Sequence, residues 1–380
     1  MVIEPRVLLD ATAIPADRGG VGRYVEKLVE ALDDAGAALS VVCQHGDAET
    51  FGRIAPRSRI VSTAEELNSR PARLAWEQTT LPRLARRLSV DVIHSPHYTM
   101  PLGAPVPSVV TLHDATFFSD RSLHISAKGR FFRAWTRLSL RRAAVCIVPS
   151  RATGSELVRL AHGHWDSLMI AYHGVDTTIF QVPSAEQVQQ VRDHLGLADQ
   201  SWIAFLGTLE PRKNVPALIR AFIRAVEPRT ERPALVLAGS AGWDSGVEPA
   251  MAAVPVEMSV IRTGHLPLLE LPGLLGGADI VAYPSLGEGF GLPVLEAMAC
   301  GAAVLTTRKL ALPEVGGDAV AYTGTGAGDI AAAITELLDQ PLRRAALSAA
   351  ALQRARKFTW AASAQAHHDA YCRAATKAAR

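Results

Sequence analysis

Short runs of apolar residues alternate with helical segments along nearly the whole chain. The runs have the length of β-strands and lack a regular polar alternation, which is typical of strands buried on both faces of a parallel sheet. Helical stretches such as residues 22–32 separate most of them. The predicted strands are residues 6–12, 40–44, 91–95, 108–114 and 144–150, and then 201–208, 234–239, 259–264, 279–285, 302–307 and 319–323. This order predicts an α/β fold with parallel sheets.

The predicted strands form two series, separated by residues 172–184, which are rich in glycine, proline and polar residues. A chain of 380 residues also exceeds what one hydrophobic core usually organises. We therefore predict two Rossmann-like domains that face each other across a cleft, at residues 1–175 and 176–357. The last segment, from about residue 358 to 380, is helical by pattern, and we expect it to pack back on the first domain.

Composition narrows the class of protein. The chain is 48% hydrophobic and 20% charged, like ordinary globular proteins, and its net charge of +2 argues against a chain-wide nucleic-acid surface. We find no signal-peptide pattern in residues 1–14 and no uncharged apolar run of the roughly 18 residues that a membrane span needs. The cysteines form no C-x-x-C pair, so we expect reduced packing residues of a cytoplasmic protein: Cys43, Cys146, Cys300 and Cys372.

Ligands of open parallel sheets bind beyond the carboxyl ends of the strands, so the residues after each strand carry the candidate chemistry. GGVGRY, residues 19–24, follows the first strand and precedes a helix. Glycines there let backbone N–H groups approach an anion. A dinucleotide site would need an acid at the end of the second strand, where Gln44 and His45 stand, so NAD is disfavoured. A tight turn explains these glycines equally well.

Two further candidates follow strands. In GTLEPRKN, residues 207–214, Arg212 and Lys213 come after a sharp turn at Gly207. An arginine fork and a lysine point charge together suit a diphosphate, although a solvated surface pair is the simpler alternative. His113 ends the strand at residues 108–114, where it is either a substrate contact or a satisfied structural histidine.

Residues 285–301, SLGEGFGLPVLEAMACG, hold two glutamates eight positions apart, Glu288 and Glu296. The pattern predicts a helix with Pro293 near its start and Gly301 as its C-cap. Glu296 would then lie in the first turn, where the helix dipole favours a carboxylate. Helix-end electrostatics does not explain Glu288, which lies in the glycine loop.

Between the two acids, the backbone N–H groups of Phe290, Gly291 and Leu292 are expected to face a ligand. A carboxylate accepts hydrogen bonds from hydroxyl pairs. One acid on each side of a donor-rich turn therefore fits a ligand with sugar hydroxyls, phosphates and a ribose diol, which is a nucleotide sugar.

The stretch from Glu288 to Glu296 resembles the E-x7-E motif of the retaining GT-B glycosyltransferases, specifically glycosyltransferase family 4. GGVGRY, GTLEPRKN and LPEVGGDAVAY resemble other segments of that family in the same order, and the resemblance covers nearly the whole chain. It implies that Glu288 holds hydroxyls of the donor sugar and that Glu296 binds the ribose. It also implies that Arg212 and Lys213 neutralise the diphosphate.

The resemblance places His113 beside the transferred sugar, so the implied catalytic set is His113, Glu288, Arg212 and Lys213. The other implied donor-binding positions are Gly19, Gly20, Gly207, Leu266, Gly289, Phe290, Gly291 and Leu292.

The chain has no Asp-x-Asp motif, so we expect neither a metal nor another cofactor, and the nucleotide sugar is a co-substrate. GDP-mannose is the first expectation for the donor, with UDP-glucose and UDP-N-acetylglucosamine as alternatives. The acceptor would be a glycan, a lipid-linked molecule or a small molecule, and no nucleic acid is expected. The alternatives are another GT-B enzyme, such as an epimerase or a phosphorylase, and a non-catalytic protein that binds sugar nucleotides.

Residues 121–142 carry seven Lys or Arg, no acid, and the aromatic residues Phe131, Phe132 and Trp135. Such a helix suits peripheral contact with an anionic membrane face. A crossover helix that packs its aromatic residues on the first sheet explains the same pattern, and the two hypotheses are compatible.

Overall fold

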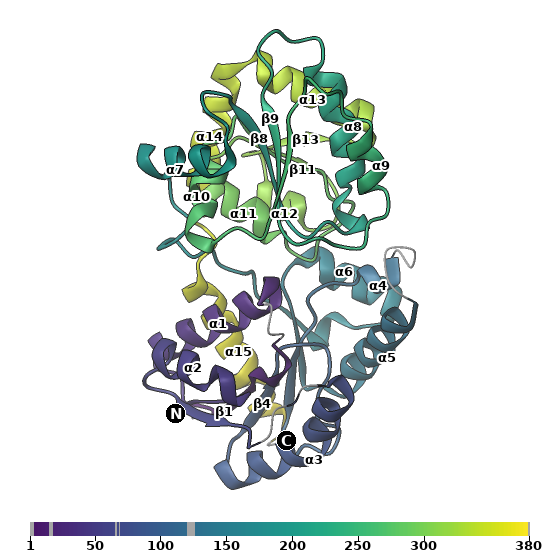
Figure 1. The fold of residues 1–380 in the computed structure, drawn as a ribbon. Helices are drawn as coiled ribbons and strands as arrows, with labels where there is room; N and C mark the ends of the chain where they lie inside the picture. The colour runs from purple at the N-terminus through teal and green to yellow at the C-terminus, as the bar shows by residue number, and fades with distance from the viewer. Residues whose placement is uncertain (1–3, 15–17, 65–66, 68, 120–125, 379–380) are drawn as a thin grey trace. The chain divides into compact units, whose positions relative to one another are not determined.

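The computed structural model describes residues 4–14, 18–64, 67, 69–119 and 126–378 (Figure 1). The chain divides into two compact units. Unit 1 comprises residues 1–174 and 359–380, and unit 2 comprises residues 175–358. Unit 1 is therefore assembled from two separate stretches of sequence, whereas unit 2 is continuous.

Unit 1 is built on a parallel sheet in the order β3-β2-β1-β4-β5-β6-β7. Its strands are β1 (Val7–Asp10), β2 (Leu39–Cys43), β3 (Arg59–Ser62), β4 (Val92–Ser95), β5 (Ser108–Thr111), β6 (Val145–Val148) and β7 (Leu168–Ile170). Its α-helices are α1 (Gly19–Asp34), α2 (Ala48–Ile54), α3 (Arg70–Leu88), α4 (Thr116–Ser119), α5 (Ser126–Arg142), α6 (Arg151–Ala161) and α15 (Trp360–Ala378).

The central strands β1, β4, β5 and β6 are buried at every position, as their continuous apolar runs predict. The sequence did not predict β3 or β7. β3 is an edge strand whose terminal residues Arg59 and Ser62 are exposed, and β7, at the other edge, has only three residues. Edge strands bury less apolar surface than central ones, so they leave a weaker pattern in the sequence.

Helix α15 packs against α1 and the sheet of unit 1 and is joined to them by a buried chain of hydrogen bonds. His367 Nδ1 donates to the Ser363 carbonyl at 2.7 Å, so Nε2 of the neutral ring accepts from the Tyr24 hydroxyl at 2.8 Å. The Tyr24 oxygen is then left to accept from the Thr111 hydroxyl at 2.9 Å. The Thr111 oxygen in turn accepts from His94 Nε2 at 2.9 Å.

The other end of this chain of hydrogen bonds is Tyr371, whose hydroxyl donates to His94 Nδ1 at 2.8 Å. Each hydrogen bond of this network has one donor and one acceptor only if both imidazoles are neutral. Burial, together with the neighbouring histidines, lowers the pKa of His94 well below its ordinary value. Burial also lowers the pKa of His367, to about 4.

Unit 2 contains a second parallel sheet, in the order β10-β9-β8-β11-β12-β13. Its strands are β8 (Trp202–Leu206), β9 (Ala234–Ala238), β10 (Val260–Gly264), β11 (Ile280–Tyr283), β12 (Val304–Thr307) and β13 (Ala321–Thr323). Its α-helices are α7 (Ala185–Leu195), α8 (Val215–Val226), α9 (Val247–Ala252), α10 (Leu271–Gly276), α11 (Leu292–Ala299), α12 (Leu312–Gly316), α13 (Ala327–Asp339) and α14 (Pro341–Ala355). The predicted α/β class with two parallel sheets is confirmed.

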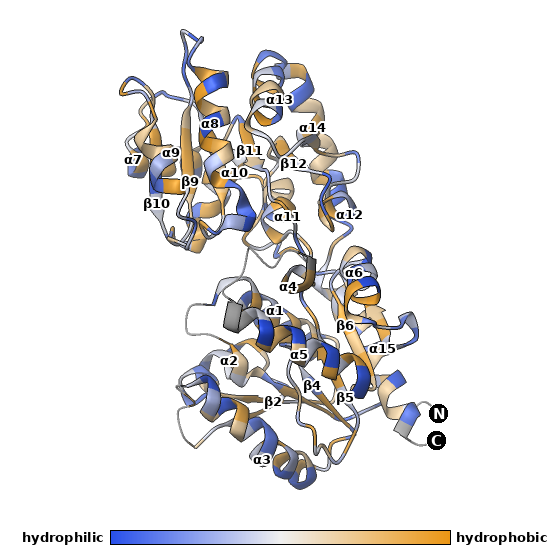
Figure 2. Ribbon diagram, turned by 90° about the vertical axis from the view of Figure 1, so that its right-hand side faces the viewer, coloured by the Kyte–Doolittle hydropathy of each residue, from blue (hydrophilic) through white to orange (hydrophobic). Residues whose placement is uncertain are grey.

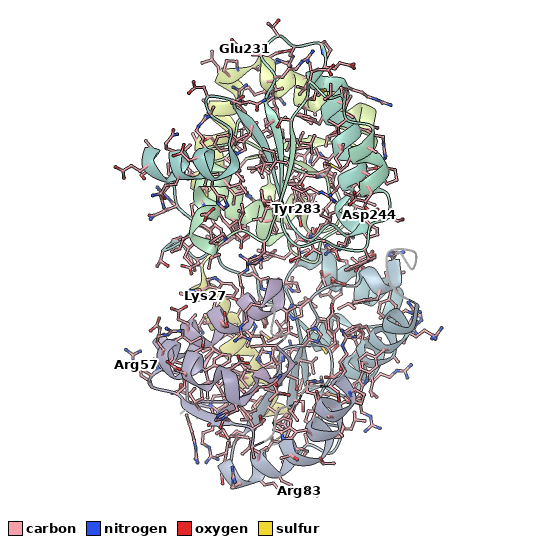
Figure 3. The ribbon with its side chains drawn as sticks, viewed as in Figure 1. Lys27, Arg57, Arg83, Glu231, Asp244 and Tyr283 are labelled. Carbon is pink, nitrogen blue, oxygen red and sulfur yellow. The ribbon has the colours of Figure 1, made fainter. Side chains whose placement is uncertain are left out.

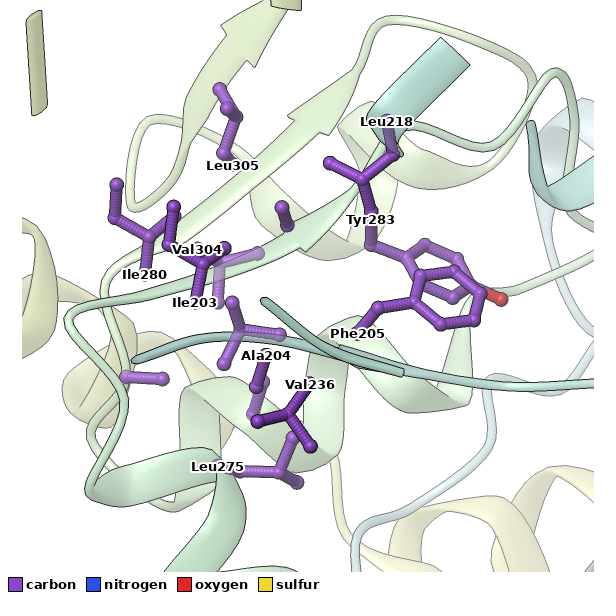
Figure 4. Packing of buried hydrophobic residues seen from close by; sticks show 14 of the residues in the cluster. Ile203, Ala204, Phe205, Leu218, Val236, Leu275, Ile280, Tyr283, Val304 and Leu305 are labelled. Carbon is purple, nitrogen blue, oxygen red and sulfur yellow. The ribbon is translucent and has the colours of Figure 1, made fainter. Parts of the chain in front are cut away.

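The core of unit 2 lies between this sheet and its helices, and the strands are mostly apolar (Figure 2). The rings of Phe205 and Tyr283 stack with centroids 5.8 Å apart, near the carboxyl ends of β8 and β11. Figure 4 shows both rings beside the aliphatic cluster, with the Tyr283 hydroxyl at the outer end of the ring. The ring of Tyr283 therefore packs in the core, while its hydroxyl oxygen lies at the edge of the sheet.

The strands β8 and β11 are neighbours in the sheet, but the chain leaves them in opposite directions, toward β9 and toward β12. The loops after two such strands diverge, and ligands of doubly wound sheets bind at this switch point. Glycine is required next to it, because a Cβ at Gly239, which has φ +133°, would lie 2.3 Å from the Gly207 carbonyl oxygen.

We expect unit 1 to lose stability in mild acid. His367 has a folded pKa of about 4, below its ordinary value of 6.5, so between these pH values the unfolded chain binds a proton that the folded chain does not. The free energy of unfolding should therefore fall as the pH falls through this window, by about 3 kcal/mol for complete titration of this group. Urea denaturation at pH 7 and pH 5 measures the effect.

The variant His367→Gln should show a shallower pH dependence than the parent, whereas the control His45→Gln, at an exposed position of the same unit, should not. Equal slopes for the parent and His367→Gln would contradict the assignment of the effect to this imidazole.

Candidate functional site

Arg212, Lys213 and Glu288 meet at the switch point of the sheet in unit 2. The short 3-10 helix η5 (Pro211–Lys213) follows β8, and the loop with Glu288 follows β11. Lys213 Nζ lies 2.8 Å from Glu288 Oε1, and Arg212 Nη1 forms an ion pair with Glu288 Oε2. Of the predicted site residues, these three are therefore brought into direct contact.

Two hydroxyls that sequence reasoning missed complete the cluster. The Tyr283 hydroxyl donates to Glu288 Oε1 at 2.9 Å, and the Ser285 hydroxyl donates to the same oxygen at 2.7 Å. Lys213 Nζ also donates to the Tyr283 oxygen. Tyr283 is the last residue of β11, and Ser285 follows the strand. Both positions are at the carboxyl end of a strand, where ligand-binding residues of parallel sheets are expected, so this rule could have identified them.

The charges of this cluster compensate one another. Burial alone would raise the pKa of Glu288, which is 6% exposed, but Arg212 and Lys213 outweigh burial and lower the pKa to about 2. Burial and the Arg212 charge lower the pKa of Lys213, against the opposing effect of Glu288. Arg212 also pairs with Glu210 at 2.5 Å. Glu288 is therefore an ionised acceptor of hydrogen bonds at neutral pH.

The cluster keeps capacity for a ligand. Each oxygen of a carboxylate has two lone-pair positions, so an oxygen that accepts one hydrogen bond can accept another. Among the described residues, Glu288 Oε1 accepts from Lys213, Tyr283 and Ser285, whereas Oε2 accepts from Arg212 alone. Lys213 uses two of its three N–H groups on described residues. One acceptor position and one cationic donor thus remain for ligand hydroxyl and phosphate groups.

Hydrogen bonds to backbone carbonyls hold this part of unit 2 together. The Leu286 N–H donates to the Arg212 carbonyl at 2.8 Å, and Arg212 Nη1 donates to the Gly287 carbonyl at 2.8 Å. Asn214 adopts a left-handed conformation with φ +60°, and its side-chain amide donates to the Thr325 carbonyl at 2.9 Å. The side chains of the cluster therefore stand on a rigid frame.

The structure corrects the predicted position of Glu296. Helix α11 begins at Leu292, after Gly291 with φ +105°, and Glu296 is its fifth residue, so it lies in the second turn and not the first. The dipole effect falls off within the first turn, so helix-end electrostatics explains this residue less well than expected. Glu296 is 3% exposed, and its charge is among the causes that raise the pKa of the buried Cys300 thiol, after burial itself.

The other predicted donor-binding positions of unit 2 lie in this loop, at the start of α11 or in the core. The side chain of Phe290 is buried and contacts Phe358 edge-on, with ring centroids 5.9 Å apart. Leu266 is buried in the core of unit 2. Leu292 is the first residue of α11, where N–H groups have no acceptor within the helix. Gly289 lies between Glu288 and Phe290 in the same loop.

The predicted residues of unit 1 lie at the carboxyl edge of its sheet. His113 Nε2 donates to the Pro96 carbonyl at 2.7 Å, and burial lowers the pKa of its imidazole, so Nδ1 of the neutral ring is an acceptor. The sequence predicted that Gly19 and Gly20 form a loop before a helix. In the structure they are instead the first two residues of α1. A Cβ at either glycine would meet no atom of the described residues within 4 Å.

Sequence reasoning also missed a buried acidic cluster in unit 1. Arg73 pairs with Glu77 at 2.7 Å and with Asp10 at 3.7 Å, and the Thr99 hydroxyl donates to Glu77 at 2.6 Å. Burial raises the pKa of Glu77 despite the Arg73 charge. Glu77 lies inside a helix and Asp10 at a strand end, so only the tertiary structure brings them together.

Helix α5 packs one of its aromatic residues within unit 1 and leaves another exposed. The ring of Phe132 stacks on Phe117 at 4.8 Å, so it packs within unit 1. Phe131 is 41% exposed, and the neighbouring Arg130 is exposed too. Residues 121–125 of the segment lie outside the described residues.

The part of the chain that the structure describes lacks two features. No helix in this part of the chain is long and apolar enough to cross a membrane. In the same residues, no three His, Cys, Asp or Glu side chains are grouped as metal ligands.

Comparison with known proteins identifies the two halves of the chain separately. The family model described as glycosyl transferases group 1 matches residues 188–354, and the one described as glycosyltransferase family 4 matches residues 18–179. The O-antigen chain mannosyltransferase B of Escherichia coli is 29% identical, over 90% of this chain and 92% of its own. The D-inositol 3-phosphate glycosyltransferase of Corynebacterium jeikeium is 27% identical, over 93% of this chain and 92% of its own.

A solved structure shows the same fold. The crystal structure of Anabaena Alr3699/HepE in complex with UDP and glucose matches with a TM-score of 0.76 and 19% identity, over 96% of this chain and 99% of that one. Both units are therefore accounted for by one known architecture, the GT-B fold. The chain belongs to the glycosyltransferases of group 1 and family 4, and it is a glycosyltransferase.

Proposed function

We propose that the protein transfers mannose from GDP-mannose to a glycan, lipid-linked or small-molecule acceptor, with retention of the anomeric configuration and without a metal ion. The relative named as an O-antigen chain mannosyltransferase supports the sugar. The observation that carries the proposal is the cluster of Arg212, Lys213 and Glu288 at the switch point of the sheet in unit 2.

The charges of the cluster suit departure of a nucleoside diphosphate. As the bond between the anomeric carbon and the phosphate oxygen breaks, negative charge grows on the diphosphate. Arg212 and the remaining N–H of Lys213 offer preorganised positive charge for it, which is electrostatic catalysis. The acceptor oxygen forms the new bond to the anomeric carbon, and its proton passes to the leaving phosphate, as the family resemblance implies.

Glu288 is better suited to hold hydroxyls than to move protons. A carboxylate with a pKa of about 2 is a weak base near neutral pH, far from the value that favours general base catalysis. Its Oε2 keeps an acceptor position for a hydroxyl of the donor sugar. We assign the ribose diol to Glu296, the diphosphate to Arg212 and Lys213, and a position beside the transferred sugar to His113.

The two glutamates should differ in their kinetic effect. Glu296→Gln removes binding to a part of the donor that changes little during reaction, so the donor KM should rise. Glu288→Gln removes contacts to the sugar that gains positive charge, so kcat should fall. Each loss weakens charge-assisted hydrogen bonds, and kcat/KM should fall about ten- to a hundredfold. Steady-state kinetics against donor concentration measures both effects.

The structure adds a requirement to this experiment. Glu288→Gln leaves two cations without their buried anion, so it should also lower stability by about 3–5 kcal/mol. Circular dichroism melting must therefore precede the kinetics, at a temperature where the variant is folded. Glu248→Gln, at a side chain that is 71% exposed in the same unit, is the matched control. If both site variants keep kcat/KM within about twofold of the parent, these glutamates do not bind the donor.

A panel of nucleotide sugars tests the donor. A ligand at a hundred times its Kd stabilises the folded chain by about 2.7 kcal/mol. GDP-mannose should therefore raise the melting temperature most, compared with UDP-glucose and UDP-N-acetylglucosamine. The rise and the transferase activity should persist in EDTA, because the cluster supplies the positive charge. A larger rise with a UDP-sugar would replace the proposed donor, and activity lost in EDTA but restored by magnesium would refute metal independence.

We also propose peripheral contact between α5 and an anionic membrane face, through Phe131 and the exposed Arg130 beside it. Basic residues attract the lipid charge and an exposed aromatic ring inserts at the interface. Phe131→Ser should weaken cosedimentation with phosphatidylglycerol vesicles, whereas Leu102→Ser, at an apolar position of the same unit that is 49% exposed, should not. Equal sedimentation of the parent and both variants would contradict the assignment.

A further inference from the structure

Unit 1 contains a cavity that none of the site residues above lines. Its volume is about 440 Å³, and it lies between helix α3 and the edge strand β3. The floor is apolar and consists of Val42, Val61 and Leu84. Ligand pockets in proteins range from about 300 to 1,000 Å³, so this one has room for a small molecule.

The packing of α3 explains why the cavity exists. Leu81, Leu84 and Ala85 of the helix pack on Leu8, Val42 and Ile93, which come from β1, β2 and β4. The helix therefore lies over the centre of the sheet. Val61 of the edge strand is only partly buried in that cluster. The surface between α3 and β3 is left as a hollow beside the core.

The wall of the cavity that α3 provides carries an aromatic ring, a hydroxyl and two cations. Trp76 is partly buried against the core cluster and lines the cavity, with Thr80 one turn further along the helix. Arg83 and Arg87 follow, and both are exposed. Figure 3 marks Arg83 on unit 1. The opposite wall adds the exposed Ser62 at the end of β3.

Arg83 and Arg87 form a like-charge pair beside the cavity. Like charges four positions apart on a helix destabilise it by about 0.2–0.5 kcal/mol. No acidic residue in the described part of the chain forms an ion pair with Arg83 or Arg87. The helix dipole favours Arg87, in the last turn, but not Arg83. An anion held between the two guanidinium groups would relieve their repulsion.

We propose that this cavity binds a pyranose that carries an anionic group, a phosphate monoester or a carboxylate. The face of the sugar ring would lie on Trp76, since an indole offers a large apolar surface. The hydroxyls of Thr80 and Ser62 would meet sugar hydroxyls, and the forks of Arg83 and Arg87 would bind the anion. The inference goes beyond the proposed function, because no residue assigned to the donor takes part.

Isothermal titration calorimetry tests the proposal with mannose 6-phosphate, glucuronate, neutral mannose and inorganic phosphate as probes. At least one anionic sugar should bind about tenfold or more tightly than mannose and phosphate, since it alone engages both the ring and the cations. Binding of mannose 6-phosphate only, or of glucuronate only, identifies the anion and supports the site. Equal affinity for all four probes, or no binding at millimolar concentration, overturns it.

Variants locate the binding. The double variant R83S/R87S should lose affinity for the anionic sugar about tenfold or more, whereas Arg86→Ser, an exposed arginine of the same helix outside the cavity, should not. Thr80→Trp should fill the cavity and block binding. Unchanged affinity in both cavity variants overturns the proposal.

The donor site must be excluded as the source of the signal. Affinity for the anionic sugar should be unchanged in Glu288→Gln, and loss of it there overturns the proposal. Conversely, failure of GDP-mannose to bind would refute the proposed function and leave this site unaffected, so the two failures are distinguishable.

Discussion

A carboxylate that is removed from water needs cations and hydroxyl donors within hydrogen-bond distance, and Glu288 meets this need with Arg212, Lys213, Tyr283 and Ser285. The arrangement of unit 2 at this edge follows from that requirement. The loops after β8 and β11 must lie together, because one carries the cations and the other the anion. The stacked ring of Tyr283 links the cluster to the core, so packing and charge fix the same geometry.

Buried polar side chains of unit 1 are satisfied in a different way. Its interior holds neutral imidazoles and hydroxyls, which satisfy one another in a single directed chain from Tyr371 to the Ser363 carbonyl. Such a network orients its members but offers no charge to a ligand. The charged groups of unit 1 instead gather at strand ends and along α3, where Arg73 compensates Glu77 and Asp10. The cluster around Glu288 in unit 2 is therefore charged, whereas the hydrogen-bond network that joins α15 to the rest of unit 1 is neutral.

The sequence predicted the features that depend on local pattern. Apolar runs indicate the buried strands. The positions directly after those strands indicate Arg212, Lys213 and Glu288 as site residues. What depends on tertiary contact was not predicted. The sequence predicts Tyr283 only as part of a strand, because the contact of its hydroxyl with Glu288 depends on the tertiary structure. Glu296 was placed one turn too early, because the helix start is set by the left-handed Gly291 and not by the proline after it.

The discontinuity of unit 1 has a consequence for how the chain is made. The core of unit 1 includes Ala364, Ala370, Tyr371 and Ala374 of α15, which are synthesised after the whole of unit 2. Domains usually fold in the order of their synthesis, the N-terminal one first. Unit 1 cannot complete its core until residues C-terminal to unit 2 have been synthesised, so unit 2 has all of its core residues before unit 1 does.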